Sequence, residues 1–465
     1  MDVEVFVTLG LGDSSFLVSS GDEAVVVDPQ RDAWRFVEAA EAKGVRIRAV
    51  LETHVHNDYI SGAREIVQAT GAEVVAPAKG EYTFDHRPAD EGEEVTIGDL
   101  TFRAWATPGH TFEHLSWAAH ETDPDTPEAV FSGGSLLVGS AGRTDLLGPA
   151  HVDELTRLQY ETVQRFRGLP GHVQLMPTHG AGSFCVSTLP TADRMSTIEL
   201  ELGHNGALLA SDQGSFARQQ LTGLMEYPRY YPHMAPVNRR GPEVFGDLPT
   251  VAALTPGEVA GLLTAGMVVI DARDRTEFAE AHLPGSLNVE LNDGFGTYVG
   301  WVTAFDVPHV LVLPDPIDGS LPEAIAQLIR VGYDRTVGYL AGGIDAWRAE
   351  GHDVRSYHVA TTKELRERIV AGDPPTVLDV RQPGEWNSEG IVPGSVLVFV
   401  GDLPERLSSI PRDRELWALC TNGHRASIAA SMLDREGIPV RLVARSGILG
   451  LLDFVSTYSA ADAPS

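Results

Sequence analysis

The stretch Thr53-His54-Val55-His56-Asn57-Asp58-Tyr59 decides how the first part of the chain is interpreted. It follows an apolar run at residues 47–51 that predicts a buried strand. Two imidazoles and a carboxylate at H-x-H-x-D spacing can converge on one point from a loop, whereas a helix would turn residues two apart to different faces. Imidazole and carboxylate groups are common ligands of zinc and iron. The stretch therefore predicts a metal site on a loop at the end of a strand.

Two more histidines follow predicted strands. His110 lies in Thr107-Pro108-Gly109-His110-Thr111, after an apolar run at 100–106, and His179 lies in Pro177-Thr178-His179-Gly180. Between them stands Gly142-Arg143-Thr144-Asp145. Short strands are also predicted at 3–8, 15–18 and 24–27, and a helix at 33–43 is predicted to end at Gly44. The first part of the chain thus alternates strands and helices and places histidines at strand ends.

The composition sets limits on function. The chain has 465 residues, which favours about three domains. It lacks an apolar run of about 18 residues that could span a bilayer, and its acidic start argues against a secretory signal. The net charge of −30 argues against binding to nucleic acid or anionic membranes, so local groups must attract any anionic substrate. The two cysteines, Cys185 and Cys420, cannot form a disulfide framework, and we expect free thiols in the cytoplasm.

The four ordered motifs resemble the metallo-β-lactamase fold, and their spacing resembles its persulfide (sulfur) dioxygenase branch. The resemblance implies an αββα sandwich with metal ligands on loops at one sheet edge. It also implies one iron(II) held by His54, His110 and an Asp, but the position that matches the Asp is Gly134. Tyr59 likewise replaces the last His of the family's H-x-H-x-D-H pattern. The usual facial triad of two His and one carboxylate cannot form with a glycine.

Three arrangements of the metal site stay open. His54, His56 and His110 could hold iron or zinc as a three-imidazole site. Asp58 or His179 could complete the coordination, or the site could be empty and the fold kept as a scaffold. Cys185, six residues after His179, is either a sulfur carrier beside the metal cleft or a small buried residue.

The second half of the chain contains an internal repeat. Val269-Ile270-Asp271-Ala272-Arg273 matches Leu378-Asp379-Val380-Arg381 at an offset near 108 residues, and Pro284-Gly285-Ser286 matches Pro393-Gly394-Ser395. A repeat of this length indicates duplicated domains, because solenoid periods are roughly 20 to 50 residues. Strands alternate with helical segments in each copy, which predicts small α/β domains with parallel sheets. The motifs resemble rhodanese domains, in which Asp271, Arg273, Asp379 and Arg381 would form structural ion pairs.

Only the second copy carries a cysteine at the position where rhodanese chemistry occurs. Cys420 begins the loop Cys420-Thr421-Asn422-Gly423-His424-Arg425 between an apolar strand and a helix. Backbone N–H groups and a helix N-terminus at such a loop favour a thiolate or a persulfide. The resemblance makes Cys420 the nucleophile and residues Thr421 to Arg425 its anion cradle. The first copy has Leu313-Pro314-Asp315-Pro316 in this place and is predicted to be inactive.

The sequence thus predicts an α/β multidomain protein. Its parts are a metallo-β-lactamase-like domain (1–202), an ordered connector (203–250), a rhodanese-like domain without the cysteine (251–355) and a rhodanese domain with Cys420 (356–465). The order resembles persulfide dioxygenase–rhodanese fusions of sulfide detoxification. This implies metal-dependent oxidation of a thiol persulfide, of the glutathione type, to sulfite, with sulfur transfer among persulfide, sulfite and thiosulfate. A homo-oligomer is expected. Three alternatives remain: a sulfurtransferase with a degenerate metal site, a non-enzymatic persulfide sensor or carrier, and a zinc hydrolase of the thioesterase type.

Overall fold

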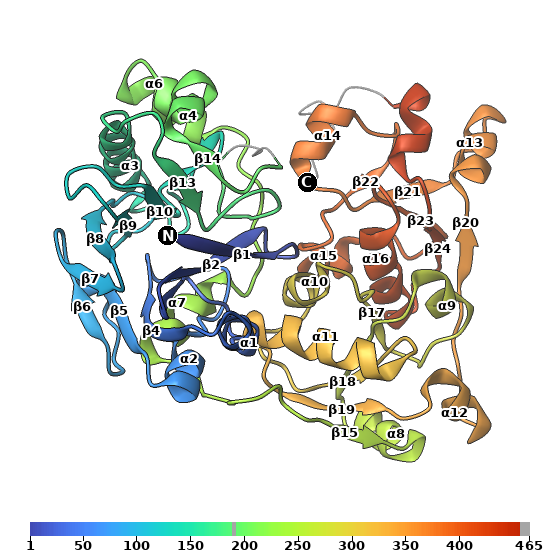
Figure 1. The fold of residues 1–465 in the computed structure, drawn as a ribbon. Coiled ribbons are helices and arrows are strands. Elements are labelled where there is room, and N and C mark those ends of the chain that lie inside the picture. The colour runs from blue at the N-terminus through green and yellow to red at the C-terminus, as the bar shows by residue number, and fades with distance from the viewer. Residues whose placement is uncertain (188–191, 456–465) are drawn as a thin grey trace. The chain divides into compact units, whose positions relative to one another are not determined.

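The computed structural model describes residues 1–187 and 192–455. The described residues divide into two compact units, of which the first lies within residues 1–248 and 329–332, and the second within 249–328 and 333–455. Figure 1 shows the elements of both units. No helix in the described ranges is both long enough and apolar enough to cross a membrane.

Two mixed six-stranded sheets form the first unit. The strands of the first sheet, in spatial order, are β1 (Asp2–Thr8), β2 (Asp13–Ser20), β3 (Glu23–Val27), β4 (Arg46–Leu51), β5 (Glu73–Pro77) and β6 (Arg87–Ala89). Those of the second sheet are β14 (Ser196–Thr197), β13 (Gln174–Pro177), β10 (Ala129–Gly133), β9 (Leu115–His120), β8 (Leu100–Ala106) and β7 (Glu94–Ile97). A short hairpin joins β11 (Leu136–Leu137) to β12 (Ser140–Ala141).

The inner faces of the two sheets share one apolar core. Phe16 and Leu51 of the first sheet pack in it with Phe102, Trp117 and Phe131 of the second. Burying such aromatic side chains stabilises the sandwich by roughly 1.5–3 kcal/mol each relative to exposure. The sheets therefore face each other as two layers.

Helices cover the outer faces of both sheets (Figure 1). On the first sheet, Phe36 of α1 (Trp34–Lys43) and Ile66 of α2 (Ala63–Thr70) pack against strand residues. On the second, Val163 of α3 (Val152–Phe166) and Phe216 of α6 (Gln213–Leu221) do so. The remaining helices of this unit are α4 (Ile198–His204), α5 (Gly206–Leu209) and α7 (Tyr231–Arg240). The predicted αββα sandwich is confirmed, and α1 ends at Gly44 in the left-handed conformation as predicted.

Strand direction brings loops to one edge of the sandwich. β3, β4 and β5 pair in parallel in the first sheet, and β10 pairs in parallel with β13 in the second. The carboxyl ends of neighbouring parallel strands lie at the same edge of a sheet, so the loops after them come together. The loops after β3 and β4 in the first sheet also meet the loop after β13 in the second, where the Thr178 hydroxyl donates to the Asp28 carboxylate, 150 residues away in the chain.

The second unit contains two five-stranded parallel sheets with the same strand pattern. The first sheet is ordered β15 (Ala252–Leu254), β19 (Thr336–Leu340), β18 (His309–Val312), β16 (Val268–Asp271) and β17 (Leu287–Asn288). The second is ordered β20 (His358–Ala360), β24 (Val440–Val443), β23 (Leu416–Leu419), β21 (Thr376–Asp379) and β22 (Val396–Leu397). Their identical order confirms the predicted duplication.

Helices flank both sheets of this unit. Those of the first copy are α8 (Pro256–Thr264), α9 (Arg275–Glu280), α10 (Phe295–Val302), α11 (Ile317–Arg330) and α12 (Gly343–Ala349). Those of the second copy are α13 (Thr362–Val370), α14 (Pro383–Glu389), α15 (Leu403–Arg406) and α16 (His424–Arg435). The predicted structural ion pairs form: Arg273 lies 2.5 Å from Asp271, and Arg381 lies 2.7 Å from Asp379.

Candidate functional sites

Five histidines gather in the interior of the first unit. They are His54, His56, His110, His114 and His179, and each is at most 1% exposed. The ring centroid of His54 lies 4.2 Å from that of His56, 4.9 Å from His114, 5.0 Å from His110 and 5.4 Å from His179. They come from the loop after β4 of the first sheet and from the loops after β8 and β13 of the second.

Ring nitrogens of His54, His110 and His179 lie within 4.8 Å of one another. His110 Nδ1 is 2.7 Å from the carbonyl oxygen of Arg143, and His110 Nε2 has no hydrogen-bond partner among the described residues. Burial, followed by the nearby His179, lowers the pKa of His110 to about 3, and burial also holds the pKa of His54 well below its usual range. Neutral imidazoles keep a free lone pair, so these residues fit a zinc or iron(II) ion.

His179 has an acidic neighbour on its other nitrogen. Its Nδ1 lies 2.8 Å from Asp13 and 3.3 Å from Asp58. Burial alone would lower the pKa of His179, but Asp58 and Asp13 outweigh it and raise the pKa to about 10. A carboxylate on the second nitrogen of a metal-binding histidine orients the ring and increases its basicity. Asp13 and Asp58 therefore suit the role of holding His179 in place.

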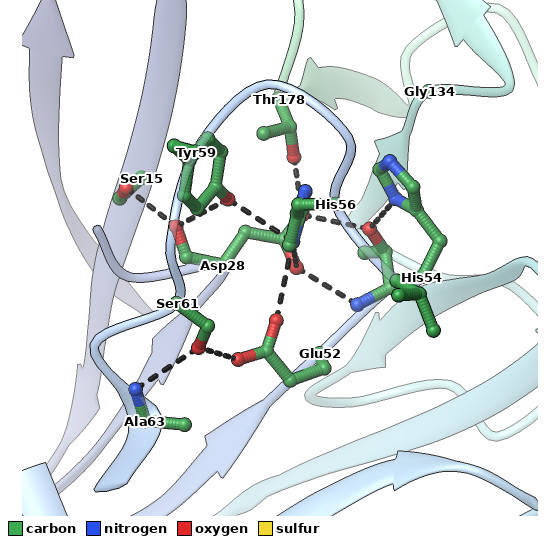
Figure 2. Close-up of polar contacts among 12 residues, drawn as sticks. Ser15, Asp28, Glu52, His54, His56, Tyr59, Ser61, Ala63, Gly134 and Thr178 are labelled. Atoms are coloured by element: carbon green, nitrogen blue, oxygen red, sulfur yellow. Dashed lines mark hydrogen bonds and ion pairs between the residues drawn. The ribbon is translucent and has the colours of Figure 1, made fainter. Parts of the chain in front are cut away.

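His56 is surrounded by oxygen atoms. Figure 2 shows its Nε2 facing Tyr59, Glu52 and Asp28, at 3.0, 3.1 and 3.3 Å. Although burial would lower the pKa of His56, Asp28 and Glu52 hold it well above its usual range. Both carboxylates therefore lie on Nε2 of His56.

His56 nevertheless belongs to two further groups of residues whose donor atoms lie within 4.8 Å of one another. These sets are Asp28, His54 and His56, and His56, Asp58 and His179. The structure does not bring His54, His56 and His110, the three imidazoles proposed from the sequence, together as one such set. We favour His54, His110 and His179 because both carboxylates beside His179 lie on its Nδ1 and leave its Nε2 3.4 Å from Nε2 of His54, whereas those beside His56 lie on its Nε2.

Gly134 and Tyr59 occupy the two positions where the sequence departs from the family pattern. A Cβ atom on Gly134 would collide with the His110 ring, and the Gly134 N–H donates to Nε2 of His114 at 2.9 Å. The Tyr59 hydroxyl donates to the carbonyl oxygen of Asp28 at 3.1 Å and lies beside His56. The His110 ring thus fills the space that a side chain at position 134 would need, and the Tyr59 phenol contacts His56.

Helix α7 contacts the loop that holds the first histidines. Its Asn238 side chain donates to the carbonyl oxygens of His56 and Tyr59 at 2.9 and 2.8 Å and accepts from the Ser61 N–H at 2.9 Å. Tyr231, also on α7, is buried. This part of the predicted connector therefore packs onto the histidine cluster.

Cys185 lies next to the same cluster. Its Sγ is 3.5 Å from a carboxylate oxygen of Asp58 and 4.0 Å from the Tyr231 hydroxyl. Burial, reinforced by Asp58, raises the pKa of the Cys185 thiol well above its usual range. A protonated thiol is a weak nucleophile, so this environment does not favour sulfur uptake by Cys185.

Sequence motifs do not identify four buried polar residues of the cluster: Asp13, Asp28, Glu52 and His114. Asp28 directly follows β3, Glu52 directly follows β4 and His114 directly precedes β9. Their position at strand ends was visible in the sequence. None of the four belongs to a recognisable spacing pattern, so only the folded structure shows that they lie together.

The second unit presents Cys420 between β23 and α16. The strand is buried, Gly423 adopts φ +99°, and α16 begins directly after it. The N–H of Gly423 points at the Cys420 Sγ, with the nitrogen 3.1 Å from the sulfur. This geometry brings the predicted backbone donor and a helix N-terminus to the sulfur, and both stabilise negative charge.

Arg425 contacts a carboxylate on α14. Its two terminal nitrogens lie 2.5 and 2.7 Å from the oxygens of Glu385, and the Thr421 hydroxyl donates to Glu385 at 2.9 Å. Glu385 thus neutralises the charge of Arg425 and ties the loop to α14. Burial lowers the pKa of the neighbouring His424 to about 3, with further lowering by Arg275 and Arg425, so this ring is neutral.

The first copy has no sulfur at the matching place. Asp271 pairs with Val312 as Asp379 pairs with Leu419, which aligns Leu313 with Cys420. A cavity of about 390 Å³ near this loop is lined by mixed charges, among them Arg273, Asp315 and Arg348. The first copy therefore has the fold of the second copy but no cysteine at this position.

Comparisons with known proteins agree with these folds. Residues 8–179 match the metallo-beta-lactamase superfamily, and residues 255–350 and 361–447 each match the rhodanese-like domain. A solved metallo-beta-lactamase from Staphylococcus aureus subsp. aureus COL has a TM-score of 0.65 at 23% identity and covers 73% of this chain and 99% of its own. The solved ETHE1 from Myxococcus xanthus has a TM-score of 0.45 at 24% identity, covering 51% of this chain and 98% of its own.

Among curated proteins, a hydroxyacylglutathione hydrolase from Methylobacillus flagellatus is 31% identical over 166 residues, 35% of this chain. One from Idiomarina loihiensis is 28% identical over 159 residues, 34% of this chain. The chain spans only 60% and 56% of these two relatives. Taken together, sequence, fold and comparisons identify a metallo-β-lactamase domain with a buried candidate metal site, followed by two rhodanese-like domains.

Proposed function

We propose that the protein is a sulfurtransferase that carries sulfane sulfur on Cys420. The observation that carries this proposal is the Gly423 N–H aimed at the Cys420 Sγ at the start of the 12-residue helix α16. A sulfur atom held there can be stabilised as an anion, either as the thiolate or as the persulfide. The neutral pair of Arg425 and Glu385 fixes the loop without adding a competing charge.

The proposed cycle has two balanced steps. The Cys420 thiolate attacks the outer sulfur of thiosulfate, a new S–S bond forms, and sulfite leaves with the electron pair of the broken bond. The resulting persulfide then gives its terminal sulfur to an acceptor thiolate, which restores the Cys420 thiolate. The Gly423 N–H faces Sγ, the atom that carries the negative charge of the thiolate before the first step and regains it as the leaving group of the second.

A second activity is supported by the histidine cluster. The donor atoms of His54, His110 and His179 lie within 4.8 Å of one another, which suits a divalent ion. We propose that the first domain oxidises a low-molecular-weight thiol persulfide, so that persulfide, dioxygen and water give thiol, sulfite and two protons. Iron(II) held by these residues would supply the oxygen chemistry, whereas zinc would supply a Lewis acid for hydrolysis. The names of the curated relatives support a glutathione-type thiol.

Sulfur transfer is tested with Cys420→Ser, and Cys185→Ser serves as the matched control. We expect Cys420→Ser to reduce thiosulfate-dependent sulfur transfer to the uncatalysed rate, because a hydroxyl cannot form a persulfide. Mass spectrometry should find one added sulfur on the Cys420 peptide of the wild type and of Cys185→Ser. Full activity of Cys420→Ser would overturn the proposal.

The metal-dependent activity is tested by elemental analysis and oxygen consumption. We expect the purified protein to hold up to one iron or zinc ion per chain, and His110→Ala to lose it. Iron-loaded wild type should consume oxygen with glutathione persulfide, and His110→Ala should not. Metal binding without oxygen consumption would exclude the oxidation and leave hydrolysis of a glutathione thioester as the activity to assay.

A further inference from the structure

The peptide between Asn422 and Gly423 supplies the backbone N–H that faces the Cys420 sulfur, which also lies 3.9 Å from Oδ1 of Asn422. Its N–H end points at the sulfur, with 3.1 Å between the Gly423 nitrogen and Cys420 Sγ. In a trans peptide the C=O and the N–H point in opposite directions, so the carbonyl oxygen of Asn422 faces away from the sulfur. Whatever binds this carbonyl oxygen also fixes the direction of the N–H.

The group that binds it comes from the copy without the cysteine. Arg275 Nη1, at the start of α9, lies 2.7 Å from the Asn422 carbonyl oxygen and 3.4 Å from that of Ala444. Glu290 holds the same guanidinium through Nε at 3.0 Å and Nη2 at 2.5 Å. The side chain of Arg275 is 19% exposed. Glu290 thus aims one terminal nitrogen of Arg275 at the cysteine loop of the other copy.

We infer that Arg275 is a positioning residue for Cys420, which fixes the Asn422–Gly423 peptide with its N–H directed at the sulfur. The inference rests on the proposed sulfur transfer and extends the sulfur-transfer site into the domain that lacks a cysteine. It also gives that domain a chemical role: Leu313 replaces the nucleophile there, while Arg275 and Glu290 act on the neighbouring copy.

Two physical effects follow from this contact. Glycine reaches positive and negative φ about equally well, so the peptide before Gly423 can rotate unless its carbonyl oxygen is held. A cation on the carbonyl oxygen also polarises the amide and strengthens its N–H as a donor. Both effects stabilise a negatively charged sulfur at Cys420.

The contact between the copies does not depend on Arg275 alone. Asn288 of β17 bonds to Ser427 of α16, and the Tyr298 ring stands edge-on to His424 at 4.7 Å. Asp434 of α16 contacts His282 at 3.1 Å and Arg355 at 2.9 Å. Removing Arg275 should therefore leave the two copies packed, and Arg355 offers a control at the same contact but at the far end of α16.

The test compares Arg275→Ala, Arg275→Lys and the control Arg355→Ala in the full chain. The readouts are the iodoacetamide alkylation rate of Cys420, followed on its peptide by mass spectrometry, and kcat and KM for thiosulfate-dependent transfer. We expect Arg275→Ala to slow alkylation about tenfold, which is the effect of losing one charge-assisted hydrogen bond of about 1.4 kcal/mol. It should lower kcat more than it raises KM, and Arg275→Lys should restore part of the rate because an ammonium can still donate to the carbonyl oxygen.

Each outcome separates this inference from the proposed function. If the wild type transfers sulfur and Arg275→Ala matches Arg355→Ala in alkylation and kcat, the positioning role is wrong. If no chain transfers sulfur but Arg275→Ala still alkylates slowly, the positioning role stands and the proposed function fails. If Arg275→Ala does not fold, Arg275→Lys and Glu290→Gln test the positioning role. Both should slow alkylation of Cys420 by an intermediate amount. An unchanged rate in both variants overturns the inference.

Discussion

At the scale of single residues, the His110 ring fills the space that a side chain at position 134 would need. A Cβ atom on Gly134 would collide with Cδ2 of this ring, and one on Gly142 would approach its Nδ1. His110 in turn keeps Nε2 free of hydrogen-bond partners among the described residues, with its Nδ1 beside the Arg143 carbonyl oxygen. The absence of a side chain at position 134 therefore leaves the room that the His110 ring occupies.

We predict that Gly134→Ala destabilises the first unit and lowers its metal content. Forcing a methyl group into packed surroundings costs about 1–3 kcal/mol, and here the group that must move is a candidate ligand. Urea unfolding and elemental analysis of the full chain measure both effects.

Gly203→Ala is the matched control for this change. Gly203 is exposed in α4 and has open space around its Cβ position, so alanine there should be neutral or stabilising. Gly134→Asp should behave like Gly134→Ala, because its Cβ meets the same ring. A higher metal content in Gly134→Asp than in the wild type would contradict this arrangement.

Glu385 gives a prediction about pH. Burial alone would raise its pKa, but Arg425 holds it below the ordinary 4.5. A carboxylate with a lowered pKa stabilises the fold above its unfolded pKa, and this contribution is lost as pH falls through the folded value. We predict that Glu385→Gln costs roughly 1–2 kcal/mol above about pH 5 and that the difference from the wild type shrinks at lower pH.

Thermal unfolding between neutral and acidic pH checks this, with Glu436→Gln as the control. Glu436 pairs with Arg412 at 3.3 Å, and both side chains are more than 40% exposed, so its removal should change little at any pH. A stability difference for Glu385→Gln that grows on acidification would contradict the assignment.

The sequence identifies site residues that lie close together in the chain. The H-x-H-x-D loop and the Cys420 loop each place their residues within a few positions, so spacing alone shows that they act together. Asp13 and His179 are 166 residues apart and meet only where an isolated bridge links the start of β2 in the first sheet to the loop after β13 in the second. Arg275 contacts Asn422 across 147 residues, and no local pattern marks an arginine after an Asp as a partner of another domain.

At the scale of elements, α7 determines how firmly the first histidine loop is held. Asn238 forms three hydrogen bonds to the loop backbone, at His56, Tyr59 and Ser61. The connector was predicted to be ordered, but its irregular composition contained no periodicity that would have assigned α7 to this loop. A single polar side chain on a short helix therefore carries a contact that hydrophobic patterning cannot reveal.

We predict that Asn238→Ala loosens the loop and destabilises the first unit by about 2–3 kcal/mol. The change leaves buried carbonyl oxygens without their donor, which costs about 1–3 kcal/mol for each unsatisfied group. Hydrogen exchange of residues 54–61 should accelerate, whereas Arg240→Ala, an exposed position on the same helix, should leave it unchanged. Equal exchange in both variants would show that α7 does not hold the loop.

At the scale of the whole molecule, the repeat and the sandwich were predictable because each follows from patterns that extend over many residues. The apolar strands, the turns between them and the 108-residue offset determine the layers and their order. The cores are separate as well: the sandwich core unites Phe16 with Trp117, whereas the second rhodanese-like core unites Trp417 with Leu451. Each unit thus buries its own apolar surface and contains its own candidate site.

This separation predicts that the two sites can be removed independently. We expect the double variant His54→Ala/His110→Ala to lose bound metal while thiosulfate-dependent sulfur transfer stays at the wild-type rate, because the candidate ligands belong to the first unit and the Cys420 loop belongs to the second. Conversely, Cys420→Ser should keep the wild-type metal content. Elemental analysis and transfer kinetics measure both effects, with His172→Ala, an exposed histidine of the first unit, as the control. A metal-depleted chain that no longer transfers sulfur would mean that the two sites share one reaction, and the independent roles assigned to His110 and Cys420 would have to be abandoned.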